Sequence, residues 1–580
     1  MKKKLLIFTS ILLITVVACT KKPTDSGGAN ATDPALNKLP SETVAFYTWN
    51  TDSEAAHRHK KGPWGDAFRL KWKDRVEKNL SKTLSAPVTE QEVNDFLEKL
   101  GLLGVEGRDP EIQKSTVFVT LKDDSIVGGA YALSEKVNLS SKLDLIRKTL
   151  PKTFKTKDGK FGSVSGFFIE SEDLIPFPLS TAASKEMLAL TSDQQVTEQL
   201  FTESDASKGV STRPSYTKLM SALDTTDALS LAFVDIEQLL DVAFKMAARS
   251  NSAKRGLDLA TLANSIANTP RTAQRVADMQ EEFSAITAEL EEARAKYLEN
   301  NPLEAAAIVT RMSTDDIFEM TTLVSVKPPK TDLQKVLLKP FAAKSAAFAL
   351  NNFPQDVALM INVDGNVFNK ALQAFDLIAK KANSKSQDVI PEEHRPLVES
   401  VNSFSLVLRT ATKSSPFPEL MVVGEMPRGK EVKDLIKTES RMAWQQKEVE
   451  GAQVDYLMTP FGMTVYLATT KDGIYITNSE AILSDTLSKK APLIKVIPAE
   501  FKRKITTNDN VILTTYAAYD KIISVVESLQ STFAALAGPQ DNIFADTGML
   551  DVLKEMGSTT ATVCFDGKHL RANSNSFILK

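Results

Sequence analysis

The segment Leu39-Pro40-Ser41-Glu42-Thr43-Val44-Ala45-Phe46-Tyr47 has the pattern of a turn that leads into a β-strand. The segment Phe353-Pro354-Gln355-Asp356-Val357-Ala358-Leu359-Met360 has the same order with one residue fewer: an apolar residue, a proline, a polar residue, an acid and a strand-forming run. An amphipathic helix is expected after each segment, at 67–80 and at 367–382. This recurrence predicts two copies of one structural unit.

The elements that follow also recur in the same order. Each copy is expected to contain a hairpin (116–131 and 404–424), a helix (139–150 and 430–438), a strand that runs into a helix (187–200 and 474–487), a second such pair (from 229 and from 511) and a closing hairpin with an acidic turn (Asp315-Asp316 and Asp566-Gly567). The shared order predicts a tandem duplication with its boundary near Pro328-Pro329.

The predicted fold class is therefore α+β, with two similar lobes of antiparallel sheet and helices at 38–330 and 331–580. A broad groove between the lobes would be the usual place for a partner. The first lobe also carries a long helical insertion at about 239–300.

Within this insertion, apolar residues recur by three and four at Val276, Met279, Phe283, Ile286, Leu290, Ala293 and Tyr297. Two interpretations stay open. The stripe is either a coiled-coil arm that recruits a partner or one side of an internal helical hairpin, covered by helices at 239–249 and 257–267.

The N-terminus has the features of an export signal. Lys2-Lys3-Lys4 precede the apolar run Leu5–Ala18, which ends in Val16-Val17-Ala18-Cys19. The run has 14 residues, whereas a membrane-spanning helix needs about 20. The last four residues resemble the lipobox of bacterial lipoproteins.

That resemblance implies that residues 1–18 are a signal peptide, that cleavage occurs before Cys19, and that the Cys19 thiol carries a diacylglycerol. Two or three acyl chains make a durable membrane anchor, whereas one chain binds only marginally. Residues 19–37 are polar and rich in small residues, so we expect a flexible tether. Thr20 stands where an aspartate would retain a lipoprotein in the inner membrane, which favours the outer membrane, with the protein facing the periplasm or the surface.

Composition is that of an ordinary globular protein, with 42% hydrophobic and 25% charged residues. The net charge of −3 gives no overall field that would attract nucleic acid, and no nucleic-acid partner is expected. The only cysteines are Cys19 and Cys564, so no disulfide framework exists, and Cys564 is expected to be a buried small hydrophobe.

The opening Leu39–Ala45, with strands and helices in this order, resembles a family of bacterial envelope proteins known only as a domain of unknown function. The resemblance implies a non-enzymatic envelope protein of mixed α/β content. It implies no catalytic residue.

Candidate chemistry in the sequence is sparse. Ser215-Tyr216-Thr217-Lys218 matches the Ser-x-x-Lys pattern of penicillin-recognising enzymes, but the chain has no Lys-Thr-Gly, and Ser215 is expected to cap a helix that starts after Pro214. Gly162–Gly166 has Val164 where a nucleophile elbow needs serine. The four histidines form no metal-binding motif, and no metal or cofactor is expected.

The leading functional hypothesis is an envelope lipoprotein, held to the membrane by its anchor, that binds or scaffolds a protein partner without catalysis. One alternative is a periplasmic carrier or chaperone for an apolar ligand, motivated by Phe167-Phe168-Ile169 and by 174–179. A serine hydrolase based on Ser215 is the less favoured alternative.

Overall fold

The protein is described by a computed structural model. It describes residues 36–61, 112–122, 125–150, 154–171, 175–202, 209–245, 288, 291–313, 317–339, 341, 353–382, 391–410, 417–459, 462–489, 492–495, 497, 511–537 and 557–577. Cys19, the expected helix at 67–80 and most of the insertion at 239–300 lie outside these ranges.

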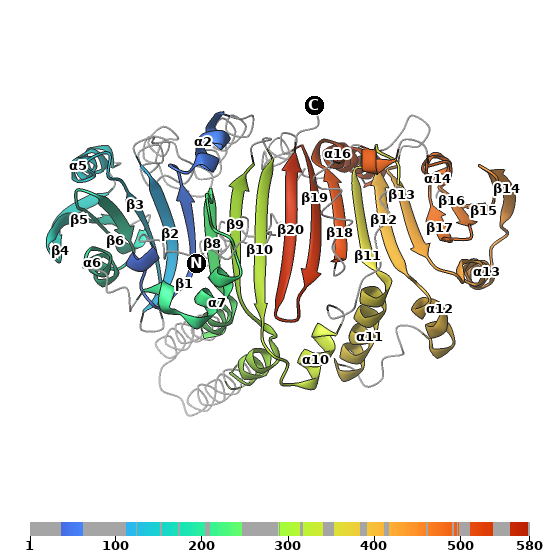
Figure 1. Cartoon of the computed structure of the whole chain (residues 1–580), viewed down its shortest axis with the longest axis horizontal. Coiled ribbons are helices and arrows are strands. Elements are labelled where there is room, and N and C mark those ends of the chain that lie inside the picture. The colour runs from blue at the N-terminus through green and yellow to red at the C-terminus, as the bar shows by residue number, and fades with distance from the viewer. Residues whose placement is uncertain are drawn as a thin grey trace, which may run out of the picture.

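One antiparallel sheet runs through the described part of the molecule (Figure 1). Its first half consists of ten strands paired in the order β4-β5-β6-β7-β3-β2-β1-β8-β9-β10. Their bounds are β1 Thr43–Asn50, β2 Lys114–Lys122, β3 Ser125–Leu133, β4 Lys155–Phe161, β5 Val164–Ser171, β6 Ile175–Ala183, β7 Met187–Thr191, β8 Ser230–Asp235, β9 Leu303–Met312 and β10 Phe318–Val326.

The second half repeats this order with ten further strands, β14-β15-β16-β17-β13-β12-β11-β18-β19-β20. Their bounds are β11 Leu359–Asp364, β12 Ser403–Arg409, β13 Glu419–Glu425, β14 Gln445–Val449, β15 Ala452–Met458, β16 Thr464–Thr469, β17 Gly473–Thr477, β18 Val511–Ala518, β19 Ser558–Phe565 and β20 His569–Phe577. The predicted combination of antiparallel sheet and helices is confirmed at this coarse level.

The two halves meet where β10 pairs with β20, and Thr321 lies opposite Asn573. Because these are the last strands of their halves and run antiparallel, the halves meet as two subunits of a symmetric dimer do. The sheet therefore continues across the junction.

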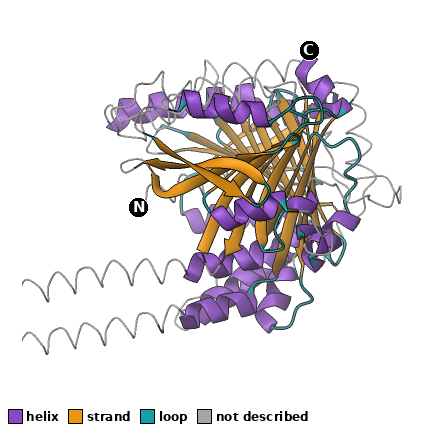
Figure 2. Cartoon of the chain, turned by 90° about the vertical axis from the view of Figure 1, so that its left-hand side faces the viewer, coloured by secondary structure: helices purple, strands orange, loops and turns teal. Residues whose placement is uncertain are grey.

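The helices lie near the strand ends and over the outer strands (Figure 2). The labelled helices are α2 Glu54–Lys61, α5 Ser140–Thr149, α6 Gln194–Phe201, α7 Pro214–Ser221, α10 Asp332–Leu338, α11 Gly365–Ala382, α12 Arg395–Glu399, α13 Gly429–Ser440, α14 Glu480–Leu487 and α16 Tyr519–Ala537. Short 3-10 turns are η1 Leu36–Lys38, η3 Val210–Thr212, η5 Glu392–His394 and η6 Leu493–Lys495. No helix in these ranges is long and apolar enough to cross a membrane.

Each half has its own apolar core on one face of the sheet. In the first half, Phe233 lies in ring contact with Phe46 and Tyr216, at centroid distances of 5.8 and 5.4 Å. In the second half, Met360 and Tyr516 face each other across β11 and β18 and are fully buried. Buried and more exposed positions alternate along these strands, and this alternation is the pattern by which the sequence predicts them.

The three-stranded meanders β4–β6 and β14–β16, which extend the sheet outward in each half, were not predicted from the sequence. Their outermost strands are polar, so they lack the alternation that identifies a half-buried strand.

The described part of the insertion favours the helical-hairpin interpretation. Residues 236–245 and 291–300 are helical, Phe244 contacts Tyr297 at a ring distance of 5.5 Å, and Arg294 pairs with Asp241. These two helical segments therefore pack against each other where they enter and leave the sheet.

Candidate functional site

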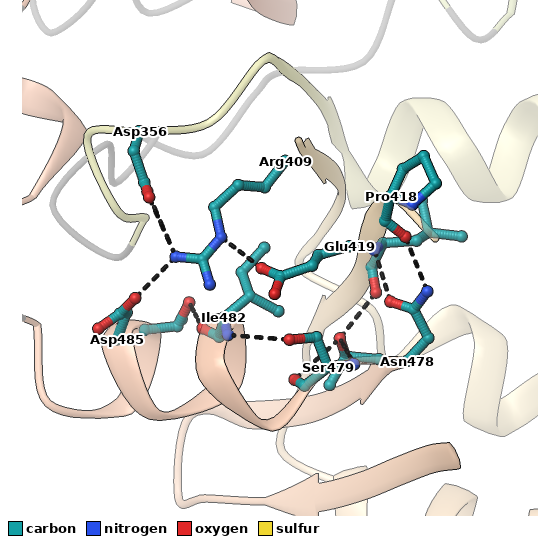
Figure 3. A network of polar contacts seen from close by, with 11 residues as sticks. Asp356, Arg409, Pro418, Glu419, Asn478, Ser479, Ile482 and Asp485 are labelled. Atoms are coloured by element: carbon teal, nitrogen blue, oxygen red, sulfur yellow. Dashed lines mark hydrogen bonds and ion pairs between the residues drawn. The ribbon is translucent and has the colours of Figure 1, made fainter. Parts of the chain in front are cut away.

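The largest buried ionic cluster among the described residues surrounds Arg409, the last residue of β12 (Figure 3). Its Nε donates to Glu419 at the start of β13, and its Nη1 donates to Asp485 of α14 at 2.7 Å. Nη1 also contacts Asp356, in the turn before β11, at 3.2 Å. The side chains of Arg409 and Glu419 are 5% and 1% exposed, so both charges are removed from water.

Burial by itself lowers the pKa of Arg409, but the hydrogen bonds to Asp485 and Glu419 outweigh it and raise that pKa above its ordinary value. Arg409 is therefore a permanent cation that joins three segments far apart in the sequence. Breaking such a pair by removing one partner is costly, because an uncompensated buried charge remains.

The loop beside this cluster is held by Asn478. Its side-chain oxygen accepts from the backbone N–H of Leu420 at 2.7 Å, and its amide donates to the carbonyl of Pro418 at 2.8 Å (Figure 3). Ser479 then caps α14 by accepting from the N–H of Ile482. The sequence locally favours this arrangement, because Asn and Ser satisfy backbone groups at a strand end and a helix start.

Among the described residues of the first half, no ion cluster occupies the position that Arg409 and Glu419 hold in the second half. The pair Thr120 and Val127 lies at the ends of β2 and β3, in the register position that Arg409 and Glu419 hold in β12 and β13. The cluster joins β12, β13, α14 and the turn before β11.

The three carboxylates of this cluster each contact the guanidinium of Arg409. Among the described residues, no group of three or more His, Cys, Asp or Glu side chains is arranged to hold a metal ion.

A second charged cluster lies between α13 and the outer strands of the second half. Asp455 of β15 is fully buried and binds Lys433 and Lys437 of α13, the latter at 2.7 Å, with a further hydrogen bond from Gln446. Burial alone raises the pKa of Asp455, but the hydrogen bonds from the two lysines and Gln446 outweigh it and hold that pKa below its usual range. The cluster fixes α13 on the sheet.

Ser215 does not cap its helix, so that prediction is wrong. Arg213 is the N-cap of α7, and Pro214 takes the first helical position, which suits its fixed φ. The buried Ser215 hydroxyl donates to Asp235 Oδ2 at 3.3 Å, and Arg213 contacts the same carboxylate at 3.4 Å.

Lys218, the other member of the Ser-x-x-Lys pattern, is bound elsewhere. Its Nζ contacts Glu304 Oε2 at 2.7 Å, and the Ser325 hydroxyl donates to the same oxygen at 2.8 Å. The hydroxyl of Ser215 and the ammonium of Lys218 are thus each held by a different carboxylate.

The remaining sequence candidates lie in structural positions. Gly162, with φ at +62°, forms the turn between β4 and β5, as a left-handed position requires. Phe167 and Ile169 of β5 are buried in a core that includes residues of α5. His57 is exposed on α2, His569 contacts Asp566 at 3.1 Å, and Cys564 is buried.

No protein-family model and no curated protein matches the chain. Matching solved structures include crystal forms I, III and IV of TP0453. The sequence identities are 13%, 8% and 14%, with TM-scores of 0.22, 0.24 and 0.21. These alignments cover 39%, 53% and 40% of this chain and 77%, 85% and 81% of the other. Similarity at this level carries no argument about fold or function.

Proposed function

We propose that this chain is a lipoprotein of the bacterial envelope that binds or scaffolds a partner without catalysis, anchored to the outer membrane through Cys19. The observation that carries the proposal is the run of charged, apolar and small residues that ends at Cys19. The first described element, η1, begins at Leu36, so removal of residues 1–18 deletes no described element.

We also propose that the scaffold arose by tandem duplication into two similar lobes. The repeated strand order supports this, and so do matched polar contacts. Thr48 hydrogen-bonds Thr116 across β1 and β2 at 3.0 Å, and Asn362 hydrogen-bonds Ser405 across β11 and β12 at 2.8 Å. A shared register and a shared contact at the same strand position are expected of two copies of one unit.

The partners of the candidate catalytic groups favour binding over catalysis. In the Ser-x-x-Lys pattern the lysine has to act on the serine, but Lys218 is bound to Glu304, and the carboxylate that Ser215 contacts is also bound to Arg213. The apolar residues that motivated the carrier alternative include Phe167 and Ile169, which already fill a core. The scaffold is therefore the function that the described geometry supports best.

Cys19→Ala should abolish incorporation of an alkyne-labelled palmitate, because the thioether is the proposed attachment point, and the variant should accumulate as precursor. Labelling in cells followed by gel fluorescence measures this. Cys564→Ala is the matched control, because it removes the other cysteine of the chain. This variant should be labelled as strongly as the unaltered protein. Equal labelling of Cys19→Ala and the unaltered protein would contradict the proposal.

A further inference from the structure

The outermost strand of the first half, β4, is strongly basic. It reads Lys155-Thr-Lys157-Asp158-Gly-Lys160-Phe, and all three lysines are exposed. Asp158 is paired with Arg147 of α5, so it does not offset the lysines. Lysines on an edge strand prevent it from pairing with the edge of another sheet. This protective role explains one or two of the three lysines.

The positive charge continues onto α5, which lies beside this edge (Figure 1). Lys148 is exposed, and three residues before it Leu145 leaves 46% of its surface in water. Residues three apart share a helix face, so an apolar side chain stands next to a cation. We call Lys148, Lys155, Lys157 and Lys160 the basic edge.

Most of the basic edge is not neutralised. Within the described ranges, Lys148, Lys157 and Lys160 form no ion pair, and Glu170 stands opposite Lys155 in β5. Asp144, in the same helix as Lys148, is an exposed acid. The edge thus keeps a net positive charge on a protein whose overall charge is −3.

The corresponding strand of the second half is different. Strand β14, at the opposite end of the sheet, reads Gln-Gln-Lys-Glu-Val, and its Lys447 pairs with Glu480. Protection of an open strand edge would apply equally to both ends. The charge difference therefore calls for a reason that is specific to the first half.

The first described turn of the chain, η1, lies in the same half of the sheet as the basic edge. Turn η1 contacts α6, and α6 contacts β4. Strand β1, which follows η1, is six strands from β4 and thirteen from β14. At about 4.8 Å per strand these separations are about 29 and 62 Å along the sheet. The 16 residues from Thr20 to Ala35 reach at most about 55 Å.

We propose that the basic edge docks on the anionic phospholipid surface to which Cys19 is anchored. This inference rests on the proposed lipid anchor, which joins the described chain at η1, fewer strands from β4 than from β14. Lysines near an anionic leaflet are attracted electrostatically, and the attraction fades within a Debye length. Leu145, exposed one turn before Lys148 on α5, adds an apolar side chain of the kind that interfacial helices place in the headgroup region.

The test uses the chain from Thr20, which carries neither signal nor lipid, with vesicles of phosphatidylcholine that either contain or lack phosphatidylglycerol. The chain should float with the anionic vesicles only, and added salt should release it. Lys148→Gln/Lys157→Gln/Lys160→Gln should weaken partitioning by about a hundredfold, or about fivefold for each lysine.

The matched control removes three exposed lysines at the other end of the molecule, by Lys430→Gln/Lys471→Gln/Lys489→Gln. It changes the net charge equally and should leave binding unchanged. Equal loss in both variants, salt-insensitive binding, or preference for soluble polyglutamate over anionic vesicles would overturn the proposal. Since the chain used here is lipid-free, these outcomes do not depend on whether Cys19 is lipidated in the cell.

Discussion

Replacing Arg409 with threonine should lower the free energy of unfolding of the second half by about 3–5 kcal/mol. Glu419 is 1% exposed and would lose the cation that compensates its charge. Asp356 and Asp485 would lose the same partner. Native-state hydrogen exchange of β12 and β13 measures the effect as faster opening of these strands.

The first half supplies the control for this change. Thr120 and Val127 hold the register position of Arg409 and Glu419, so Arg409→Thr/Glu419→Val copies a pair that the same fold already accommodates. The double variant should recover most of the lost protection, since replacing a whole buried ion pair costs far less than breaking it. Equal loss in the single and double variants would show that the pair does not act through its buried charge.

A disulfide between Thr321→Cys and Asn573→Cys should form and should stabilise the chain by about 5 kcal/mol. The two residues lie opposite each other in β10 and β20. Opposite residues of an antiparallel pair are about 4.5–5.5 Å apart at Cα, which a disulfide can span. The bond would close a loop of roughly 250 residues, which accounts for the size of the effect. Urea midpoints with and without reductant measure it.

This experiment needs Cys564→Ala in the chain from Thr20, so that only the introduced thiols remain. The matched control is Thr322→Cys with Asn573→Cys, because neighbouring residues of a strand point to opposite faces of the sheet. A bond in the control, or none between positions 321 and 573, would contradict the register that joins the two halves.

Much of the fold could be predicted because buried strands and amphipathic helices have distinct periods. The predicted strand and helix at 187–200 correspond to β7 and α6, and the expected helix at 139–150 contains α5. The pairing of β10 with β20 could not be read in the same way. Periodicity identifies a strand but does not say which distant strand lies beside it.

The outer strands escaped prediction for a different reason. Strand β4 has four charged residues and no alternating apolar face, so its sequence is that of a solvated loop. It is a strand because β5, whose Phe167 and Ile169 are buried, offers it a backbone to pair with. Tertiary context decides the structure of such a segment.

The Arg409 cluster was also missed, although Asp356 lies within one of the two quoted segments. Its members come from positions 356, 409, 419 and 485, and each looks like an ordinary surface charge in its own stretch of sequence. The one available signal was a difference between the two halves: a cation and an acid stand where the first half has Thr120 and Val127.

The most direct test of lipid anchoring is the mass of the N-terminal peptide of the protein purified from the membranes of its host. The peptide should begin at Cys19, with a diacylglyceryl group on the thiol and, in a host that completes the modification, a further acyl chain on the amine. A peptide that retains residues 1–18, or one in which the Cys19 thiol is unmodified, would contradict the account.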